Sequence, residues 1–197
     1  MPGAAALLCV LANNTLHLAM IADCAAYVFG HEGARLITPV QTSVKDTYGQ
    51  YLKKNDPHFD NEAWRKRYRK EFRNNPNAII SMLGEMLHPG YGAITGEPGA
   101  DSFVVLLEET LGPDDVVLIA SDGCRAVPPE EMNEILTTRI REGKPNIVLP
   151  EIFGRAQMLA NDNGKHSDDR TGILFVPEHL VQITHGNNIP SAYSIDS

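Results

Sequence analysis

Two acidic segments of the sequence have residue types and spacing that suit divalent cations. Asp122 follows the apolar run 116–120 after one residue, Ser121, and is itself followed by Gly123; Asp168 stands shortly before the apolar run 172–176. Mg²⁺ and Mn²⁺ prefer carboxylate oxygens held by a rigid scaffold, and the end of a buried strand is such a scaffold. The glycine lets another group approach the backbone closely. We therefore take Asp122 and Asp168 as candidate metal ligands.

Each candidate also has a plainer interpretation. An Asp-Gly pair after an apolar run is typical of a turn that ends a strand, and Asp168 suits a solvated turn equally well. A third aspartate, Asp23, stands between the apolar runs 16–22 and 25–29. Its position suits hydrogen bonding to loop amides.

Other chemistries find little support. The seven histidines form no HxxxH or HxH pair, so no zinc site is predicted. His166 could donate a proton to a leaving group, or it could simply be exposed in a polar loop. Ser121 lacks the Gly-x-Ser-x-Gly context of a nucleophile, and the glycine-rich residues 90–99 lack the lysine of a phosphate-binding loop. No catalytic or substrate-binding residue is therefore assigned.

The three cysteines, Cys9, Cys24 and Cys124, are widely spaced and form no CxxC pair. This spacing predicts neither a zinc ribbon nor a disulfide framework. Each thiol is expected to be a small buried group in a reducing compartment, so we predict a cytoplasmic location.

The bulk composition is that of a globular protein. The chain has 197 residues, of which 43% are hydrophobic and 21% charged, and its formal net charge is -8. That charge argues against a general nucleic-acid binder, because phosphate backbones reward clustered positive charge. No run approaches the ~20 apolar residues needed to span a bilayer. We predict partners other than nucleic acid or membrane.

Short apolar runs joined by tight turns predict antiparallel strands. The expected strands are 4–11, 16–22, 25–29, 35–38, 103–107, 116–120, 172–176 and 180–184. Helices are expected at 62–73, from 128 to about 140, and from 149 to about 161, whereas 42–61 and 84–100 are expected to be irregular. This order predicts an α+β protein with antiparallel β-sheet.

The helix expected at 62–73 carries Trp64, Tyr68 and Phe72 at four-residue spacing, which places one aromatic stripe along it. Most of its other positions are basic: Arg65, Lys66, Arg67, Arg69, Lys70 and Arg73. The favoured interpretation is a helix docked by its aromatic stripe with a solvated basic face. The alternative is a clamp for a phosphorylated or acidic partner, because arginine binds phosphate with two hydrogen bonds.

Several segments, in order along nearly the whole chain, resemble the metal-dependent protein phosphatases (PPM family, type 2C). Ala22-Asp23-Cys24-Ala25-Ala26 resembles the family's Gly-Asp-Ser-Arg-Ala segment, although only the aspartate and one alanine are kept. Residues 117–123 match its Ser-Asp-Gly segment, and residues 165–171 resemble its Gly-Ser-x-Asp-Asn-x-Thr segment, with Asp169 in the asparagine position. The family's N-terminal Glu-Asp-Asn and Asp-Gly-x-Gly motifs are absent from the sequence.

The resemblance implies an α-β-β-α sandwich, with antiparallel sheets packed between helices, that is N-terminally truncated. It implies a single domain over 1–197 with a loop and basic helix insertion at about 42–76. It further implies hydrolysis of phosphoserine and phosphothreonine in proteins by water activated by two Mg²⁺ or Mn²⁺ ions. Asp122 and Asp168 would be ligands of these ions, and Asp23 would belong to a third, weaker position.

Two functions stay open at this point. The first is a metal-dependent protein serine/threonine phosphatase, with a phosphorylated protein as substrate and a companion segment or chain that supplies the absent motifs. The second is a catalytically inactive phosphatase-like binding module or fragment, which recognises a partner through the helix at 62–73 and an exposed sheet edge.

Overall fold

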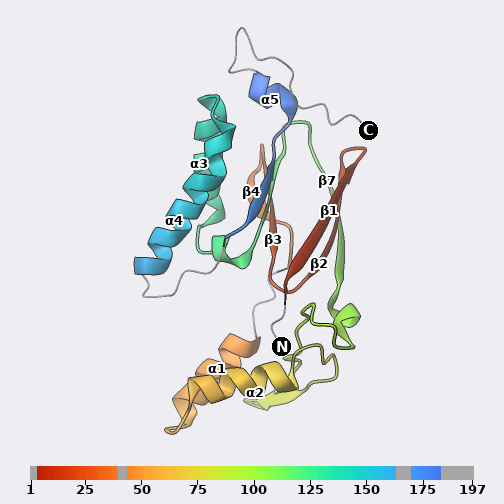
Figure 1. Ribbon diagram of the computed structural model, residues 1–197, viewed down its shortest axis with the longest axis vertical. Coiled ribbons are helices and arrows are strands. Elements are labelled where there is room, and N and C mark those ends of the chain that lie inside the picture. The colour runs from red at the N-terminus through yellow and green to blue at the C-terminus, as the bar shows by residue number, and fades with distance from the viewer. Residues whose placement is uncertain (1–3, 40–43, 163–169, 183–197) are drawn as a thin grey trace. The chain divides into compact units, whose positions relative to one another are not determined.

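The structure is a computed structural model that describes residues 4–39, 44–162 and 170–182. The chain divides into two compact units, one of Met1–Cys24 with Thr38–Thr110 and one of Ala25–Ile37 with Leu111–Ser197. Figure 1 shows the elements of both units. The prediction of one domain over 1–197 stays a prediction.

The first unit contains a three-stranded antiparallel sheet in the order β1 (Ala6–Ala12), β2 (Thr15–Ile21) and β7 (Val105–Thr110). The turn between β1 and β2 is Asn13-Asn14, and both residues have positive φ, of 49° and 62°. Asparagine tolerates this left-handed region, so the residue types select a tight hairpin turn. Alternate residues of β2, namely Leu16, Leu18 and Met20, are buried. The hairpin predicted from the sequence is therefore confirmed.

The predicted basic helix is α2 (Asn61–Glu71). Asp60 caps its first turn, because the carboxylate accepts hydrogen bonds from the backbone N–H groups of Glu62 (2.8 Å) and Ala63 (3.2 Å). The aromatic stripe packs as predicted: Trp64 and Tyr68 are buried, together with Phe72 just beyond the helix.

The irregular segment predicted at 42–61 is wrong over most of its length, because Val44–Asn55 forms helix α1. Its residues Tyr48 and Leu52 share one face and pack against the cluster around Trp64. Gly49, which looks like a helix breaker in the sequence, stands where a side chain would not fit: a Cβ at Gly49 would lie 2.9 Å from Trp64 Nε1. The tight contact between the helices thus accounts for the glycine.

The segment 84–100 is mostly irregular, as predicted, but its start belongs to a short hairpin of β5 (Ile80–Met82) and β6 (Glu85–Leu87). The hairpin turns at Leu83 and Gly84, both with positive φ. A 3₁₀ helix, η1 (Ala100–Phe103), leads into β7.

The second unit contains a four-stranded antiparallel sheet in the order β4 (Gly33–Leu36), β3 (Ala25–Gly30), β8 (Val116–Ala120) and β9 (Gly172–Phe175). Helices α3 (Pro129–Arg141) and α4 (Val148–Asp162) share its core (Figure 1). Fully buried members of this core include Leu118, Met132 and Ile152. Two 3₁₀ helices, η2 (Asp122–Cys124) and η3 (Pro145–Ile147), complete the connections.

The strand predicted at 180–184 is wrong over its described part, because Glu178–Gln182 forms the short helix α5. The Leu180 N–H donates to the Pro177 carbonyl (3.0 Å), which closes the first turn directly after the proline. Val176 and Leu180 both pack against the core of the second unit. All strand ladders among the described residues are antiparallel, which confirms the α+β prediction. Within the described ranges, no helix is long and apolar enough to cross a bilayer.

The Asp60 cap gives a first testable prediction. Replacing Asp60 with alanine should lower the free energy of unfolding by about 1 kcal/mol, because two N–H groups of α2 lose their acceptor. Urea unfolding followed by the fluorescence of Trp64, the one tryptophan of the chain, would measure this. Asp60→Asn keeps an acceptor and should lose less; equal losses in the two variants would contradict the capping role.

Candidate functional site

Asp122 lies at the end of strand β8 in the second unit. It is the first residue of η2, and its carbonyl accepts a hydrogen bond from the Arg125 N–H (2.9 Å). The side chain of Asp122 is exposed, in contrast to the fully buried strand that precedes it. The backbone at Asp122 is thus held by a hydrogen bond, while its side chain stays accessible.

The chain segment before β9 is held against this same end of β8. The register pairs Ala120 with Gly172, and the two flanking residues continue it. The Ser121 N–H donates to the Thr171 carbonyl (2.9 Å), and the Thr171 N–H donates to Ser121 Oγ (3.1 Å). The approach to β9 is therefore anchored one residue away from Asp122. Asp168, the second predicted ligand, lies outside the described residues.

Two arginines and a cysteine surround the end of β8. Burial raises the pKa of Cys124 to about 11, with Arg170 opposing the rise and Asp122 adding to it. These influences place both Arg170 and Asp122 near the thiol. Burial also raises the pKa of Tyr27, and the nearby Arg125 opposes that rise. Cys124 is therefore a neutral buried thiol rather than a nucleophile.

The predicted burial of all three cysteines holds for Cys124 alone, because Cys9 and Cys24 are half-buried; all three are free thiols.

Asp23 lies in the first unit, in the short connection between β2 and β3. Its side chain is exposed, and the preceding Ala22 has φ 68°. The negative charge of Asp23 contributes to the raised pKa of Tyr91, so its carboxylate lies near that phenol. Within the described ranges, no three His, Cys, Asp or Glu side chains gather closely enough to hold a metal ion. Metal binding by Asp23, Asp122 and Asp168 stays a prediction.

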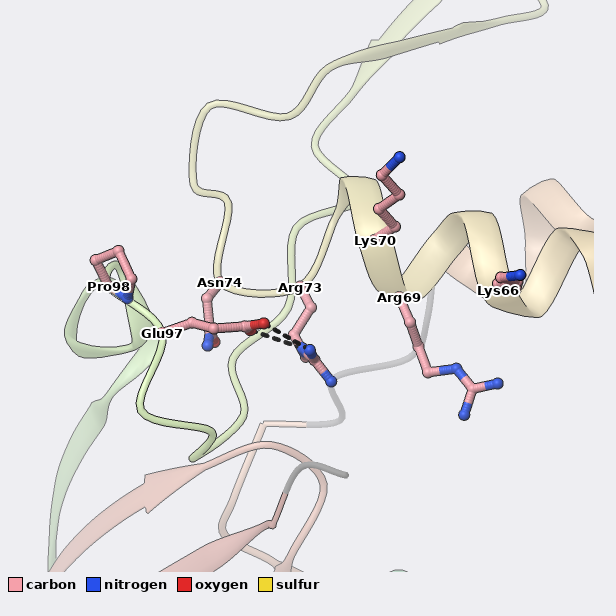
Figure 2. Close-up of a pocket in the computed structure, with 7 residues that line it drawn as sticks. All are labelled: Lys66, Arg69, Lys70, Arg73, Asn74, Glu97 and Pro98. Atoms are coloured by element: carbon pink, nitrogen blue, oxygen red, sulfur yellow. Dashed lines mark hydrogen bonds and ion pairs between the residues drawn. The ribbon is translucent and has the colours of Figure 1, made fainter. Parts of the chain in front are cut away.

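A second polar site, the basic groove, lies in the first unit (Figure 2). It has a volume of about 810 Å³ and is lined by Lys66, Arg69, Lys70, Arg73, Asn74, Glu97 and Pro98. The basic residues of α2 could be recognised in the sequence, but no sequence pattern connects them with their partners in residues 89–98. Those partners lie in a Gly/Pro-rich stretch without periodicity, about twenty residues further along the chain.

One edge of the basic groove is an ion pair. Arg73 donates from Nε to Glu97 Oε2 (2.9 Å) and from Nη2 to Glu97 Oε1 (2.7 Å), and Thr95 Oγ1 donates to Glu97 Oε2 (2.9 Å). The Arg73 side chain is only 9% exposed. The hydrogen bond to Arg73 lowers the pKa of Glu97, and the same bond raises the pKa of Arg73. Both groups are therefore charged, and each neutralises the other.

Asn74 joins the end of α2 to the chain at residues 93–95. Its Nδ2 donates to the Ala93 carbonyl (3.0 Å) and to Thr95 Oγ1 (3.1 Å), while its Oδ1 accepts from the Ala93 N–H (2.8 Å). Asn74 is 7% exposed and has φ 52°. One side chain thus satisfies the backbone of Ala93 and, through Thr95, supports Glu97.

Tyr91 lies beside the arginines of the groove. Its ring stacks on Tyr68 with centroids 5.3 Å apart and an interplanar angle of 9°. Burial raises the pKa of Tyr91, while the positive charges of Arg73 and Arg69 lower it. Both guanidinium groups therefore lie within electrostatic reach of this phenol.

Among the comparisons with known proteins, the one with solved structures finds matches. No family model matches the sequence. No curated protein matches it either. Among solved structures, a sex-determining protein of C. elegans matches with a TM-score of 0.56 and 15% identity, covering 92% of this chain and 43% of its own.

Two solved phosphatases match to a similar degree. The Mycobacterium tuberculosis serine/threonine phosphatase has a TM-score of 0.52 at 18% identity and covers 87% of this chain and 59% of its own. The serine-threonine phosphatase 2C of Toxoplasma gondii has a TM-score of 0.51 at 14% identity, and the match covers 86% of this chain and 57% of that phosphatase. The chain thus spans about half the length of these structures. Over that span it is structurally similar to the PPM-type serine/threonine phosphatases, and its α+β fold is that of part of a PPM domain.

Proposed function

We propose that this chain takes part in metal-dependent hydrolysis of phosphoserine and phosphothreonine in proteins. The observation that carries the proposal is the exposed carboxylate of Asp122 at the end of a buried strand, in a chain with the fold of PPM phosphatases. Oxygen donors of this kind suit Mg²⁺ or Mn²⁺. A cytoplasmic location remains the expectation from the sequence.

Each candidate ligand has a separate part in this proposal. Asp122 and Asp168 would hold two ions, and Asp23 would contribute to a third. When bound, such ions lower the pKa of water and stabilise charge on a phosphoryl group. The chain's own contribution is positional: the two hydrogen bonds between Ser121 and Thr171 fix the backbone on both sides of the site. A carboxylate held in this way needs little reorganisation to bind a cation.

We further propose that a companion segment or chain supplies additional ligands, since two or three carboxylates alone bind hard cations weakly. Strand β1 is the edge of its three-stranded sheet, and a sheet edge can accept another strand. Large apolar side chains on this sheet are exposed, among them Leu8 (65%), Val10 (52%) and Leu106 (75%). Uncovered apolar surface of this kind favours a partner.

The second candidate function is a binding module without catalysis. It is favoured by the basic groove in the first unit. In this case the chain would keep the phosphatase scaffold and recognise a phosphorylated protein without hydrolysing it.

Phosphate release from a phosphothreonine peptide, with Mn²⁺ or with a chelator, tests the proposal. We expect release with Mn²⁺ that the chelator abolishes, because the proposed water activation needs the ion. Binding of Mn²⁺ to the chain, followed by electron paramagnetic resonance, gives an independent readout. A folded chain that neither binds Mn²⁺ nor releases phosphate would support the binding module instead.

A further inference from the structure

We propose that the basic groove binds an acidic peptide segment that carries phosphoserine or phosphothreonine. The choice of a phosphorylated protein segment rests on the proposed function, but the binding itself requires neither metal nor turnover. The groove would then act as a recognition site of the chain.

The charge of the groove is the first reason. Four of its seven lining residues are cationic and one is anionic. The anion, Glu97, is already held by Arg73. In the parts of the chain that the structure describes, no ion pair involves Lys66, Arg69 or Lys70. Three positive charges therefore remain to be balanced in a chain whose net charge is -8.

The rigidity of the groove is the second reason. Lys66, Arg69 and Lys70 project from a capped helix whose other face is fixed by the buried Trp64 and Tyr68. Directly after α2, the hydrogen bonds of Asn74 and the Arg73–Glu97 ion pair hold the end of this helix to residues 93–97. A surface that is already ordered loses less entropy when it binds a ligand.

The spread of the cations indicates an extended ligand. In Figure 2 the side chains of Arg69 and Lys70 point to opposite sides of the helix end, and Lys66 lies one turn away. These groups do not converge on one small anion, so they suit a segment with several negative groups. The volume of about 810 Å³ is in the range of ligand-binding pockets in proteins and can accommodate a few residues of a peptide.

The phosphate of such a segment has a natural partner in Arg69. A guanidinium group binds a phosphate with paired, charge-assisted hydrogen bonds, which an ammonium group cannot match in geometry. Arg69 also lies near the Tyr91 phenol, a further hydrogen-bond donor. The acidic residues around the phosphate would then face Lys66 and Lys70.

The same charges argue for a peptide over a nucleic acid. A long polyanion would also run along the rest of this acidic chain and be repelled there. A short segment experiences mainly the charges within about 8–10 Å, since salt screens the remainder. The local positive groove thus attracts a peptide despite the net charge of -8.

The test is direct binding in the presence of a chelator, which excludes turnover. The probe is a fluorescent peptide in which phosphothreonine is flanked by Asp and Glu, followed by anisotropy. Arg69→Gln with Lys70→Gln should weaken binding by about tenfold, because two charge pairs are lost. Lys53→Gln with Lys54→Gln, at the exposed end of α1 outside the groove, makes the same charge change and should leave binding within about twofold.

The outcomes separate clearly. Equal weakening by the two double variants would overturn the proposal, and so would equal binding of the same peptide with plain threonine. Tighter binding of an RNA oligonucleotide than of the phosphopeptide would overturn it as well. If the peptide binds through the groove but Mn²⁺-dependent turnover is absent, the result supports the groove as a binding site and contradicts the proposed phosphatase activity. If turnover is present but binding does not depend on the groove residues, the result supports the phosphatase activity and overturns the groove as a binding site.

Discussion

Asp122→Asn is expected to reduce Mn²⁺-dependent phosphate release by at least about 100-fold. The amide keeps the shape of the carboxylate but removes the negative charge that binds the ion. Even groups that only support a metal ligand cost about 10–100-fold when they are replaced, so a ligand itself should cost at least the upper value. The fold should be unaffected, because the Asp122 side chain is exposed and its carbonyl still accepts the Arg125 N–H.

Asp114→Asn is the matched control for this experiment. Asp114 is also exposed and stands in the turn before β8, where its carboxylate lies 2.7 Å from His179 Nε2. Loss of one exposed pair should change phosphate release by about twofold or less. Similar losses in both variants would point to a general charge effect, and unchanged release by Asp122→Asn would exclude Asp122 as a ligand.

The sequence was sufficient where local residue types decide the conformation. The Asn13-Asn14 turn, the alternation of Leu16, Leu18 and Met20, and the aromatic stripe of α2 all have periods or backbone preferences that neighbouring residues set. These elements are found where they were predicted. The resemblance to PPM phosphatases, built on short motifs in order, is confirmed as similarity of fold.

The sequence was insufficient where a distant contact decides. Helix α1 contains Gly49 and few apolar residues, and the ring of Trp64 accounts for the glycine. The short helix α5 was predicted as a strand, because a brief apolar run after a proline fits either period. In both places the local pattern is weak and packing determines the outcome.

The candidate sites differ in the same way: one is marked by local residue types, and the other depends on contacts between distant residues. Asp122 could be found from the sequence because a strand end and a glycine mark it. The network around Glu97 could not, since the hydrogen bonds of Arg73 and Asn74 reach residues 19 to 24 positions further along, in an aperiodic segment. No spacing rule links such residues before the chain is folded. The basic face of α2 was predicted as solvated or as a clamp, and the groove gives the second interpretation a formed structure.

Asn74→Ala is expected to lower the free energy of unfolding by about 3 kcal/mol or more. The substitution leaves the N–H and carbonyl of the buried Ala93 without their partners, at about 1–3 kcal/mol for each unsatisfied group. Alanine at a positive φ adds about 1 kcal/mol, which asparagine largely avoids. Urea unfolding followed by Trp64 fluorescence would measure the loss.

Two further variants separate these contributions and connect them with the groove. Asn74→Gly loses the same hydrogen bonds but tolerates φ 52°, so it should be about 1 kcal/mol more stable than Asn74→Ala. Asn77→Ala, at an exposed position nearby, should change stability by less than about 0.5 kcal/mol. If Asn74→Ala were no less stable than Asn77→Ala, the amide would not hold residues 93–95 to the helix end. Because Thr95 connects that amide to Glu97, both Asn74 variants should also weaken phosphopeptide binding under conditions in which they remain folded.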